Sequence, residues 1–211
     1  MPMIKCEFYL ASAINNKCSE NTVNISTAQI GLYGNLFSES LILHTDEHYN
    51  IYTKPQKGRL WKLKSTMNVT IGDYGFLLNK VKSPAVSGTI GEAVVIPALT
   101  ASMGINSNTF GFQRLKSRFK CPDFLVETMP EFDKLWNMTP GSSSKFPPDM
   151  PLEVKSRLTR DNGYPHTAVD QLKRYWSECK SIDPQRDGYG IIARVNIASS
   201  NITIRYYLFT K

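Results

Sequence analysis

The chain lacks the patterns that mark several common classes of protein. Only four cysteines occur among 211 residues and none forms a CxxC pair, which argues against a cysteine-based zinc site. So few cysteines also suit a reducing compartment. No apolar run approaches the ~18 residues of a transmembrane helix, and no secretory signal is visible near the start. These absences predict a cytoplasmic, intracellular protein with no membrane partner.

Motifs for nucleotide and hydrolase chemistry are also missing. The sequence has no GxxxxGK[ST] phosphate loop and no GxSxG turn, so we expect no nucleotide cofactor. His44 and His48 fit the spacing of an HxxEH zinc motif, which requires a helix. The residues around them have the composition of strands joined by an acidic turn. A zinc protease is therefore not the prediction.

Basic residues outnumber acidic residues in this chain. The formal net charge is +7, from 25 lysines and arginines against 18 acidic residues. A surplus of this size favours a polyanionic partner such as nucleic acid, and a basic protein without such a partner is an equal alternative from composition alone. The hydrophobic content of 41% and the charged content of 20% are those of a folded protein with a sizeable core.

Residues 1–85 have an irregular pattern and are interpreted as an N-terminal extension of unknown role. Residues 40–44 and 48–53 are candidate strands. A basic cluster surrounds Trp61, and it either grips a nucleic-acid backbone or forms a solvated face. Its members are Lys54, Lys57, Arg59, Lys62 and Lys64.

Residues 86–211 have the pattern of an α/β core, in which helices flank a mixed sheet. Proline, glycine and serine in residues 129–151 indicate a connecting loop with one short helical turn near residues 132–136. Pro97 is expected to kink the first helix. The predicted order is a helix at 87–99, strands at 110–120, 123–127 and 152–158, a helix at 168–180, and a hairpin of strands 189–198 and 201–209.

The segment from Leu152 to Ser156 carries the most informative chemistry. In a strand, Glu153 and Lys155 point to one side while Val154 points into the core. Asp123, at the start of the preceding strand, would add a second carboxylate. Two carboxylates beside a lysine suit a hard divalent metal ion and a polarised water. This combination indicates phosphodiester cleavage.

These residues occur in an order that resembles the PD-(D/E)xK nuclease superfamily. Its last element resembles the QxxxY motif of the RecB-like branch. The residues that carry the resemblance are Glu92, Asp123, Glu153, Lys155, Gln171 and Tyr175. The resemblance implies a restriction-endonuclease-like fold over residues 86–211, with a mixed central sheet flanked by helices, and a Mg²⁺-dependent deoxyribonuclease that acts as an endonuclease.

The resemblance also implies a role for each position. Asp123, Glu153 and the backbone carbonyl of Val154 would bind Mg²⁺, with Mn²⁺ as a substitute. Lys155 would assist the attacking water, and Glu92 and Gln171 would support the catalytic group. DNA would be the partner, and its predicted contacts are Arg157, Lys173, Arg174 and Tyr175.

Several alternatives stay open at this point. Asp149 also follows a proline and precedes Glu153, but the three residues between them cannot form two paired strands and a turn, which favours Asp123. Tyr175 is alternatively a core aromatic residue. The function is alternatively that of a non-catalytic DNA-binding or assembly protein on the nuclease fold, or of a nuclease toxin or effector. A homodimer is an open option.

Overall fold

The structure of the chain is a computed structural model. It describes residues 3–26, 29–30, 33, 43–44, 84–106, 109–116, 122–157, 166–180, 183–198 and 201–211. The basic cluster around Trp61 and the candidate strand at residues 48–53 lie outside the described residues. Of the candidate strand at residues 40–44, the described pair Leu43–His44 forms strand β3, so His44 is in a strand, as its flanks predicted.

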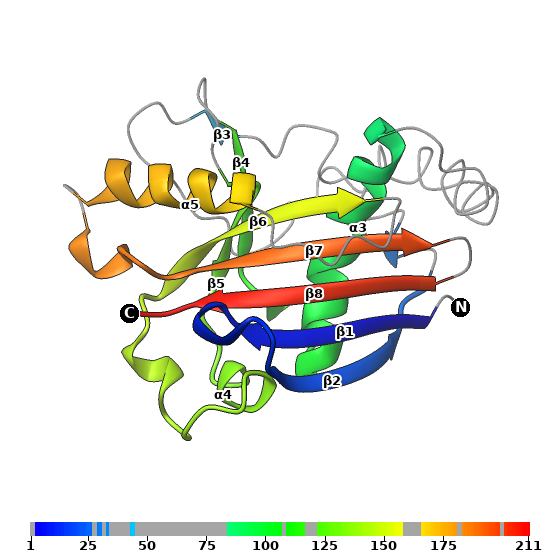
Figure 1. Ribbon diagram of the computed structural model, residues 1–211, viewed down its shortest axis with the longest axis horizontal. Coiled ribbons are helices and arrows are strands. Elements are labelled where there is room, and N and C mark those ends of the chain that lie inside the picture. Colours follow the sequence, from blue (N-terminus) through cyan, green and yellow to red (C-terminus); the bar gives the residue numbers. More distant parts are fainter. Residues whose placement is uncertain are drawn as a thin grey trace.

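Among the described residues, eight strands form a mixed sheet at the centre of the fold, with the strand order β2-β1-β8-β7-β6-β5-β4-β3 (Figure 1). The pairs β1–β8, β6–β7 and β3–β4 are parallel, and the other neighbouring pairs are antiparallel. The strands are β1 (Met3–Leu10), β2 (Lys17–Asn24), β3 (Leu43–His44), β4 (Phe112–Lys116), β5 (Phe124–Glu127), β6 (Asp149–Arg157), β7 (Gly190–Ala198) and β8 (Asn201–Phe209).

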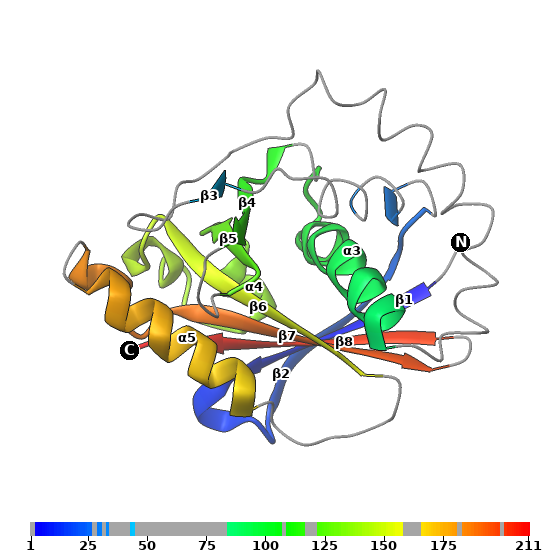
Figure 2. The same ribbon diagram turned by 90° about the horizontal axis from the view of Figure 1, so that it is seen from above.

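Two long helices, α3 and α5, lie on opposite faces of this sheet (Figure 2). The helices are α3 (Pro84–Met103), α4 (Phe132–Leu135) and α5 (His166–Cys179), with 3₁₀ turns η1 (Ala11–Ala13), η4 (Ser143–Lys145) and η5 (Pro184–Arg186). Helix α3 continues through Pro97, and the Thr100 hydroxyl donates hydrogen bonds to the carbonyls of Ile96 and Pro97, both at 3.1 Å. The predicted α/β class and element order are thus confirmed.

The sequence patterns explain how each helix packs against the sheet. Helix α3 is apolar over most of its surface and is largely buried against the sheet, as expected for a helix without a polar face. Helix α5 is amphipathic, and its buried side chains include Ala168, Leu172 and Tyr175. The first two pack with Ile192 of β7. The 3.6-residue period therefore predicted this helix correctly.

The first two strands extend the sheet that residues 84–209 build. β1 pairs in parallel with β8, so that Ile4 lies opposite Ile202, and β2 pairs with β1. The pattern of residues 1–85 gave no indication of this pairing. The assignment of separate roles to residues 1–85 and residues 86–211 stays a prediction.

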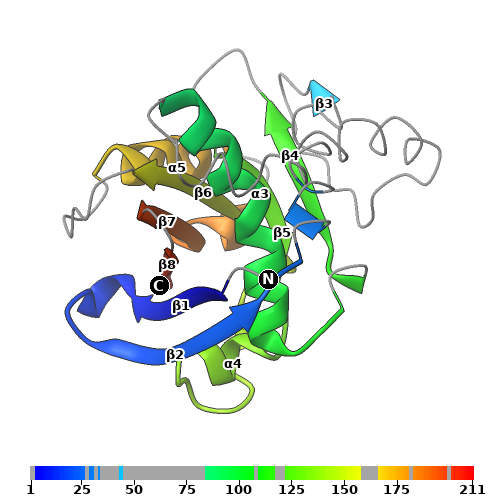
Figure 3. The same ribbon diagram turned by 90° about the vertical axis from the view of Figure 1, so that its right-hand side faces the viewer.

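The connecting segment between β5 and β6 packs against these first strands. Helix α4 lies beside β2 (Figure 3). The Trp136 Nε1–H donates to the Tyr9 carbonyl at 3.0 Å, and both Phe132 and Trp136 are buried. The Asp133 carboxylate accepts from the backbone N–H groups of Gly141 and Ser143, which closes the loop. The predicted loop with one helical turn is confirmed, and it completes one end of the core.

Within the described part of the chain, no helix combines the length and apolar composition that crossing a membrane requires.

Candidate active site

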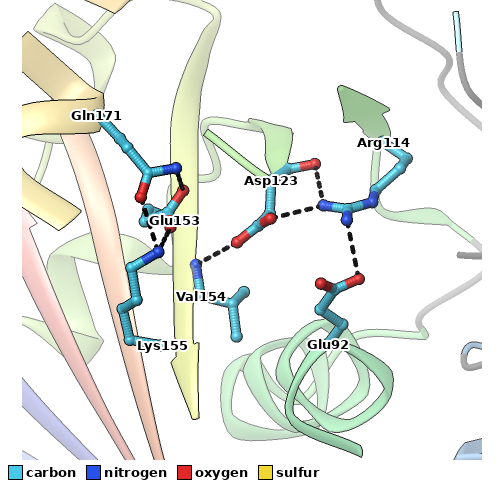
Figure 4. Close-up of polar contacts among 7 residues, drawn as sticks. All are labelled: Glu92, Arg114, Asp123, Glu153, Val154, Lys155 and Gln171. Atoms are coloured by element: carbon cyan, nitrogen blue, oxygen red, sulfur yellow. Dashed lines mark hydrogen bonds and ion pairs between the residues drawn. The ribbon is translucent and has the colours of Figure 1, made fainter. Parts of the chain in front are cut away.

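The antiparallel pairing of β5 with β6 brings Asp123 beside Glu153. This pairing places Phe124 opposite Leu152 and ends there, so that Asp123 and the segment after Leu152 meet at the point where the strands part. Asp123 Oδ2 accepts a hydrogen bond from the Val154 backbone N–H at 2.8 Å (Figure 4). The long connecting segment of residues 128–148 therefore does not separate the two acidic positions.

Strand β6 directs Glu153 and Lys155 toward helix α5, as the alternation predicted. The Lys155 ammonium contacts Glu153 Oε1 and donates to Gln171 Oε1 at 2.7 Å. The Gln171 Nε2–H donates to Glu153 Oε2 at 3.1 Å. The Glu153 side chain is fully buried, whereas 27% of the Lys155 side chain is exposed. Gln171 therefore restrains both Glu153 and Lys155, the acid and the lysine of the same motif.

A second group forms around Arg114 of strand β4. Its guanidinium lies 2.8 Å from Asp123 Oδ1 and 3.0 Å from Glu92 Oε2 of helix α3. It also donates to the Asp123 carbonyl at 2.9 Å and lies 5.0 Å from the centre of the Phe124 ring. The motif pattern does not contain Arg114. Strand β4 has the sequence Phe-Gln-Arg-Leu-Lys, and the signal for Arg114 is a basic side chain on a strand that pairs beside Asp123.

The two groups lie on opposite sides of strand β6 (Figure 4). Glu153, Lys155 and Gln171 are on the α5 side, and Arg114 and Glu92 are on the α3 side. The Asp123 contact to Val154 N–H joins them through the backbone of β6. The five predicted catalytic residues thus form two groups linked by Asp123, with Glu153, Lys155 and Gln171 on one side of β6 and Glu92 with the additional residue Arg114 on the other.

Two carboxyl groups of this site, those of Glu153 and Glu92, have raised pKa values. Burial raises the pKa of Glu153 to about 8, and the charge of Asp123 acts in the same direction while Lys155 opposes it. Burial also raises the pKa of Glu92 to about 7, where Arg114 opposes the shift and Asp123 adds to it. Added positive charge would favour the ionised carboxylates. Burial is the first cause of both shifts, so both carboxyl groups hold a proton more readily than they would in water.

The donor atoms of the site suit a hard divalent cation, because Mg²⁺ takes carboxylate oxygens and water. Among the described residues, no group of three or more His, Cys, Asp or Glu side chains is arranged to hold a metal ion. In the described arrangement, both oxygens of Asp123 and both of Glu153 accept from internal donors. Each carboxylate oxygen has two lone pairs, so these oxygens retain capacity for an ion. The role of the Val154 carbonyl stays a prediction.

The predicted DNA-contacting residues have different surroundings. Arg157, Lys173 and Arg174 are exposed, and Arg174 pairs with Glu178 at 3.2 Å on the same helix. Tyr175 is fully buried, and its hydroxyl accepts a hydrogen bond from Arg186 at 3.3 Å. Tyr175 thus occupies a core position with no surface open to a substrate. For the exposed residues Arg157, Lys173 and Arg174, contact with DNA stays a prediction.

The rival acid Asp149 belongs to the same strand as Glu153, as their short separation required. Asp149 Oδ1 lies 2.6 Å from the Arg186 guanidinium, and the side chain of Asp149 is almost fully buried. Arg186 also pairs with Asp183 at 3.1 Å. This ion-pair network connects η5 to the start of β6. Asp149 therefore has a structural partner, and Asp123 is the acid next to Glu153.

Comparison with known proteins adds no relative to this picture. No protein-family model, no curated protein and no solved structure matches the chain. The α/β class with a mixed sheet rests on the structure itself. The resemblance to the PD-(D/E)xK superfamily stays a prediction from the order of its six residues in the sequence.

Proposed function

We propose that this protein is a Mg²⁺-dependent endonuclease that hydrolyses DNA phosphodiester bonds with a PD-(D/E)xK-type site. The observation that carries the proposal is the convergence of two acids, a lysine and a glutamine from three separate elements. Asp123 precedes β5, Glu153 and Lys155 come from β6, and Gln171 comes from α5. A surface ion pair on one strand would need neither Asp123 nor Gln171 beside it.

The order and pairing of the elements also support the proposal. From α3 to β7 the chain forms α3, β4, β5, the short helix α4, β6, α5 and β7, with β6 parallel to β7. This is the order that the sequence patterns predicted for residues 86–211. A restriction-endonuclease-like fold is the finer assignment that we attach to the mixed sheet.

Asp123 and Glu153, with the carbonyl of Val154, are the groups that would hold the divalent ion. When bound, Mg²⁺ lowers the pKa of a water molecule and neutralises negative charge on the scissile phosphate. Mn²⁺ takes similar oxygen ligands and is expected to substitute for it. Arg114 pairs with both Glu92 and Asp123, so Glu92 would be linked to the metal-binding acids through this arginine.

Lys155 would act on the attacking water and on the phosphate. Its ammonium lies at the edge of the buried Glu153 and is partly exposed, so a phosphate oxygen or a water can approach it. A fixed positive charge stabilises the negative charge that develops on the phosphate in the transition state. Gln171 keeps this ammonium in place by accepting one of its hydrogen bonds and restrains Glu153 by donating another.

The charge of the protein suits DNA as a substrate. The chain carries a net charge of +7, and Arg157 lies two residues beyond Lys155 on the same side of β6. Lys173 and Arg174 add exposed cations on helix α5. Such residues attract the phosphate backbone without reading its sequence.

Incubation of the purified protein with supercoiled plasmid and Mg²⁺ tests the proposal directly. We expect nicked and linear products with Mg²⁺ or Mn²⁺ and none in EDTA. A closed circle offers no end to an exonuclease, so these products would identify an endonuclease. Asp123→Ala, Glu153→Ala and Lys155→Ala should each lower the rate by about 10²-fold or more. Lys134→Ala, an exposed lysine on α4, is the matched control and should cleave at the wild-type rate. Full-rate cleavage by Lys155→Ala or Asp123→Ala would refute the assignment.

The same preparations separate the two alternative functions. Strong DNA binding in EDTA, together with no cleavage in Mg²⁺ or Mn²⁺, would indicate a non-catalytic DNA-binding or assembly protein. Toxicity on expression that disappears with Glu153→Ala would indicate a nuclease toxin or effector.

A further inference from the structure

Arg114 is the one member of the candidate site that the family resemblance does not explain. Its guanidinium bridges Asp123 and Glu92, which come from a loop before β5 and from helix α3. The side chain is 18% exposed and lies over the Phe124 ring, so its position is restrained by both charge and packing. It is therefore a fixed cation placed between two of the acids of the site.

We infer that Arg114 is the internal counter-cation of the candidate metal site, and that it competes with the divalent ion for the Asp123 carboxylate. This inference rests on the proposed function, because it assigns the residue that regulates metal binding at the same site. Arg114 is in this view a positioning residue: it acts through Asp123 and Glu92, and not on the phosphate.

The physical argument is one of charge balance. Without Arg114, the carboxylates of Asp123 and Glu92 would face each other with no cation between them, which disfavours their ionised forms. The guanidinium supplies that cation in the metal-free protein, and it holds Asp123 by a hydrogen bond and Glu92 by an ion pair. A divalent ion at Asp123 supplies the same compensation and is repelled by the charge of Arg114. The residue should therefore stabilise the metal-free fold and weaken metal binding.

These opposite effects distinguish the inference from a purely structural ion pair. A structural residue would reduce stability on removal whether metal is present or not, and it would leave metal affinity unchanged or lower. Arg205 offers a matched comparison, because its guanidinium pairs with Glu7 at 2.8 Å and its side chain is 22% exposed. Arg205 lies on β8, two strands away from β6 in the sheet.

The experiment measures Mn²⁺ binding by isothermal titration calorimetry and thermal unfolding in EDTA and at saturating Mn²⁺. Arg114→Gln should bind Mn²⁺ about tenfold more tightly than the wild type, because one like charge beside the ligands is removed. Its melting temperature should fall in EDTA and recover with Mn²⁺. Arg114→Lys keeps the charge and should keep the wild-type affinity. Arg205→Gln should also keep that affinity, and its loss of stability should not recover with Mn²⁺.

The outcomes separate this inference from the proposed function. Equal or weaker Mn²⁺ binding by Arg114→Gln, in a protein whose cleavage depends on Asp123 and Glu153, would overturn the counter-cation role alone. No Mn²⁺ binding by either protein and no cleavage would overturn both. If Arg114→Gln is unfolded in EDTA, Mn²⁺ should restore its fold, and failure to do so would overturn the inference.

Discussion

The Asp123 carboxylate accepts a hydrogen bond from the backbone N–H of Val154 at 2.8 Å. This contact attaches the start of β5 to the middle of the Glu153–Lys155 motif. It occurs where the β5–β6 pairing ends, so a side chain takes the place of a strand partner. The contact gives Asp123 a fixed orientation toward β6.

The same substitution at the two acids that follow proline should have opposite consequences. Asp123→Asn should abolish cleavage and, because it weakens the ion pair with Arg114, lower the free energy of unfolding by less than the change at Asp149, since Asp123 is more exposed. Asp149→Asn should cleave normally when folded, but it weakens a buried ion pair and should lower the free energy of unfolding by about 1–3 kcal/mol. Urea denaturation and plasmid cleavage of both variants provide the measurements. Loss of cleavage in folded Asp149→Asn would contradict the choice of Asp123.

Gln171 should matter for turnover more than for stability. Gln171→Ala removes one hydrogen bond to Glu153 and one from Lys155, so we expect kcat to fall about 10–100-fold, as for other residues that orient metal-site ligands. The melting temperature should change by only a few degrees. Asp170→Ala, the exposed neighbour on α5, is the control and should retain the wild-type kcat. Wild-type turnover in Gln171→Ala would remove this residue from the site.

Two glycines of helix α3 should respond differently to alanine. A Cβ at Gly91 would lie 1.9 Å from Ser156 Oγ and 3.0 Å from Ser156 Cβ, so in Gly91→Ala either the Ser156 side chain must rotate or helix α3 must move away from β6. We expect a loss of about 1–3 kcal/mol in unfolding free energy and lower cleavage, because Glu92 is the next residue. At Gly88 no atom lies within 4 Å of an added Cβ. Gly88→Ala should therefore stabilise the protein by up to about 1 kcal/mol through helix propensity.

A second substitution, at Ser156, tests whether contact with this residue causes the loss in Gly91→Ala. Ser156→Gly removes the side-chain atoms that the added methyl group would meet, so combining it with Gly91→Ala should restore part of the cleavage activity. The measurement is the rate of plasmid cleavage at a temperature where both variants are folded. Equal loss in the single and double variants would show that contact with Ser156 is not the cause.

The buried Glu153 should make metal-free stability depend on pH. Its folded pKa of about 8 lies above the ordinary value of 4.5, so the folded state holds a proton that the unfolded state releases between these pH values. The free energy of unfolding in EDTA should therefore fall as pH rises through this window, by at most about 1.4 kcal/mol per pH unit for one proton. Urea titrations at several pH values measure this slope.

A substitution identifies the group responsible for the slope. Glu153→Gln cannot ionise and should remove the part of the slope that Glu153 causes, leaving the part due to Glu92, whose pKa is about 7, whereas the exposed control Glu178→Gln should keep the full slope. Mg²⁺ should also flatten it in the wild type, because a cation favours the ionised carboxylate. An unchanged slope in Glu153→Gln would assign the pH dependence to another group.

Local sequence patterns predicted much of what positions the site. The two-residue period of a strand placed Glu153 and Lys155 on one side and Val154 on the other, and the structure agrees. The amphipathic period predicted α5, which carries Gln171. The short separation of Asp149 from Glu153 left Asp123 as the acid of the preceding strand. Each of these features depends only on residues that are close together in the sequence.

Long-range pairing decided the rest, because which strands and side chains meet depends on how distant segments close one core. The sequence alone does not place β1 beside β8, bury Tyr175 against Leu125, or seat Arg114 between Glu92 and Asp123. Arg114 of β4 becomes a partner of two acids only when β4, β5 and α3 pack together. The sequence by itself determined the chemistry available to the site. The tertiary structure decided which charges compensate one another within it.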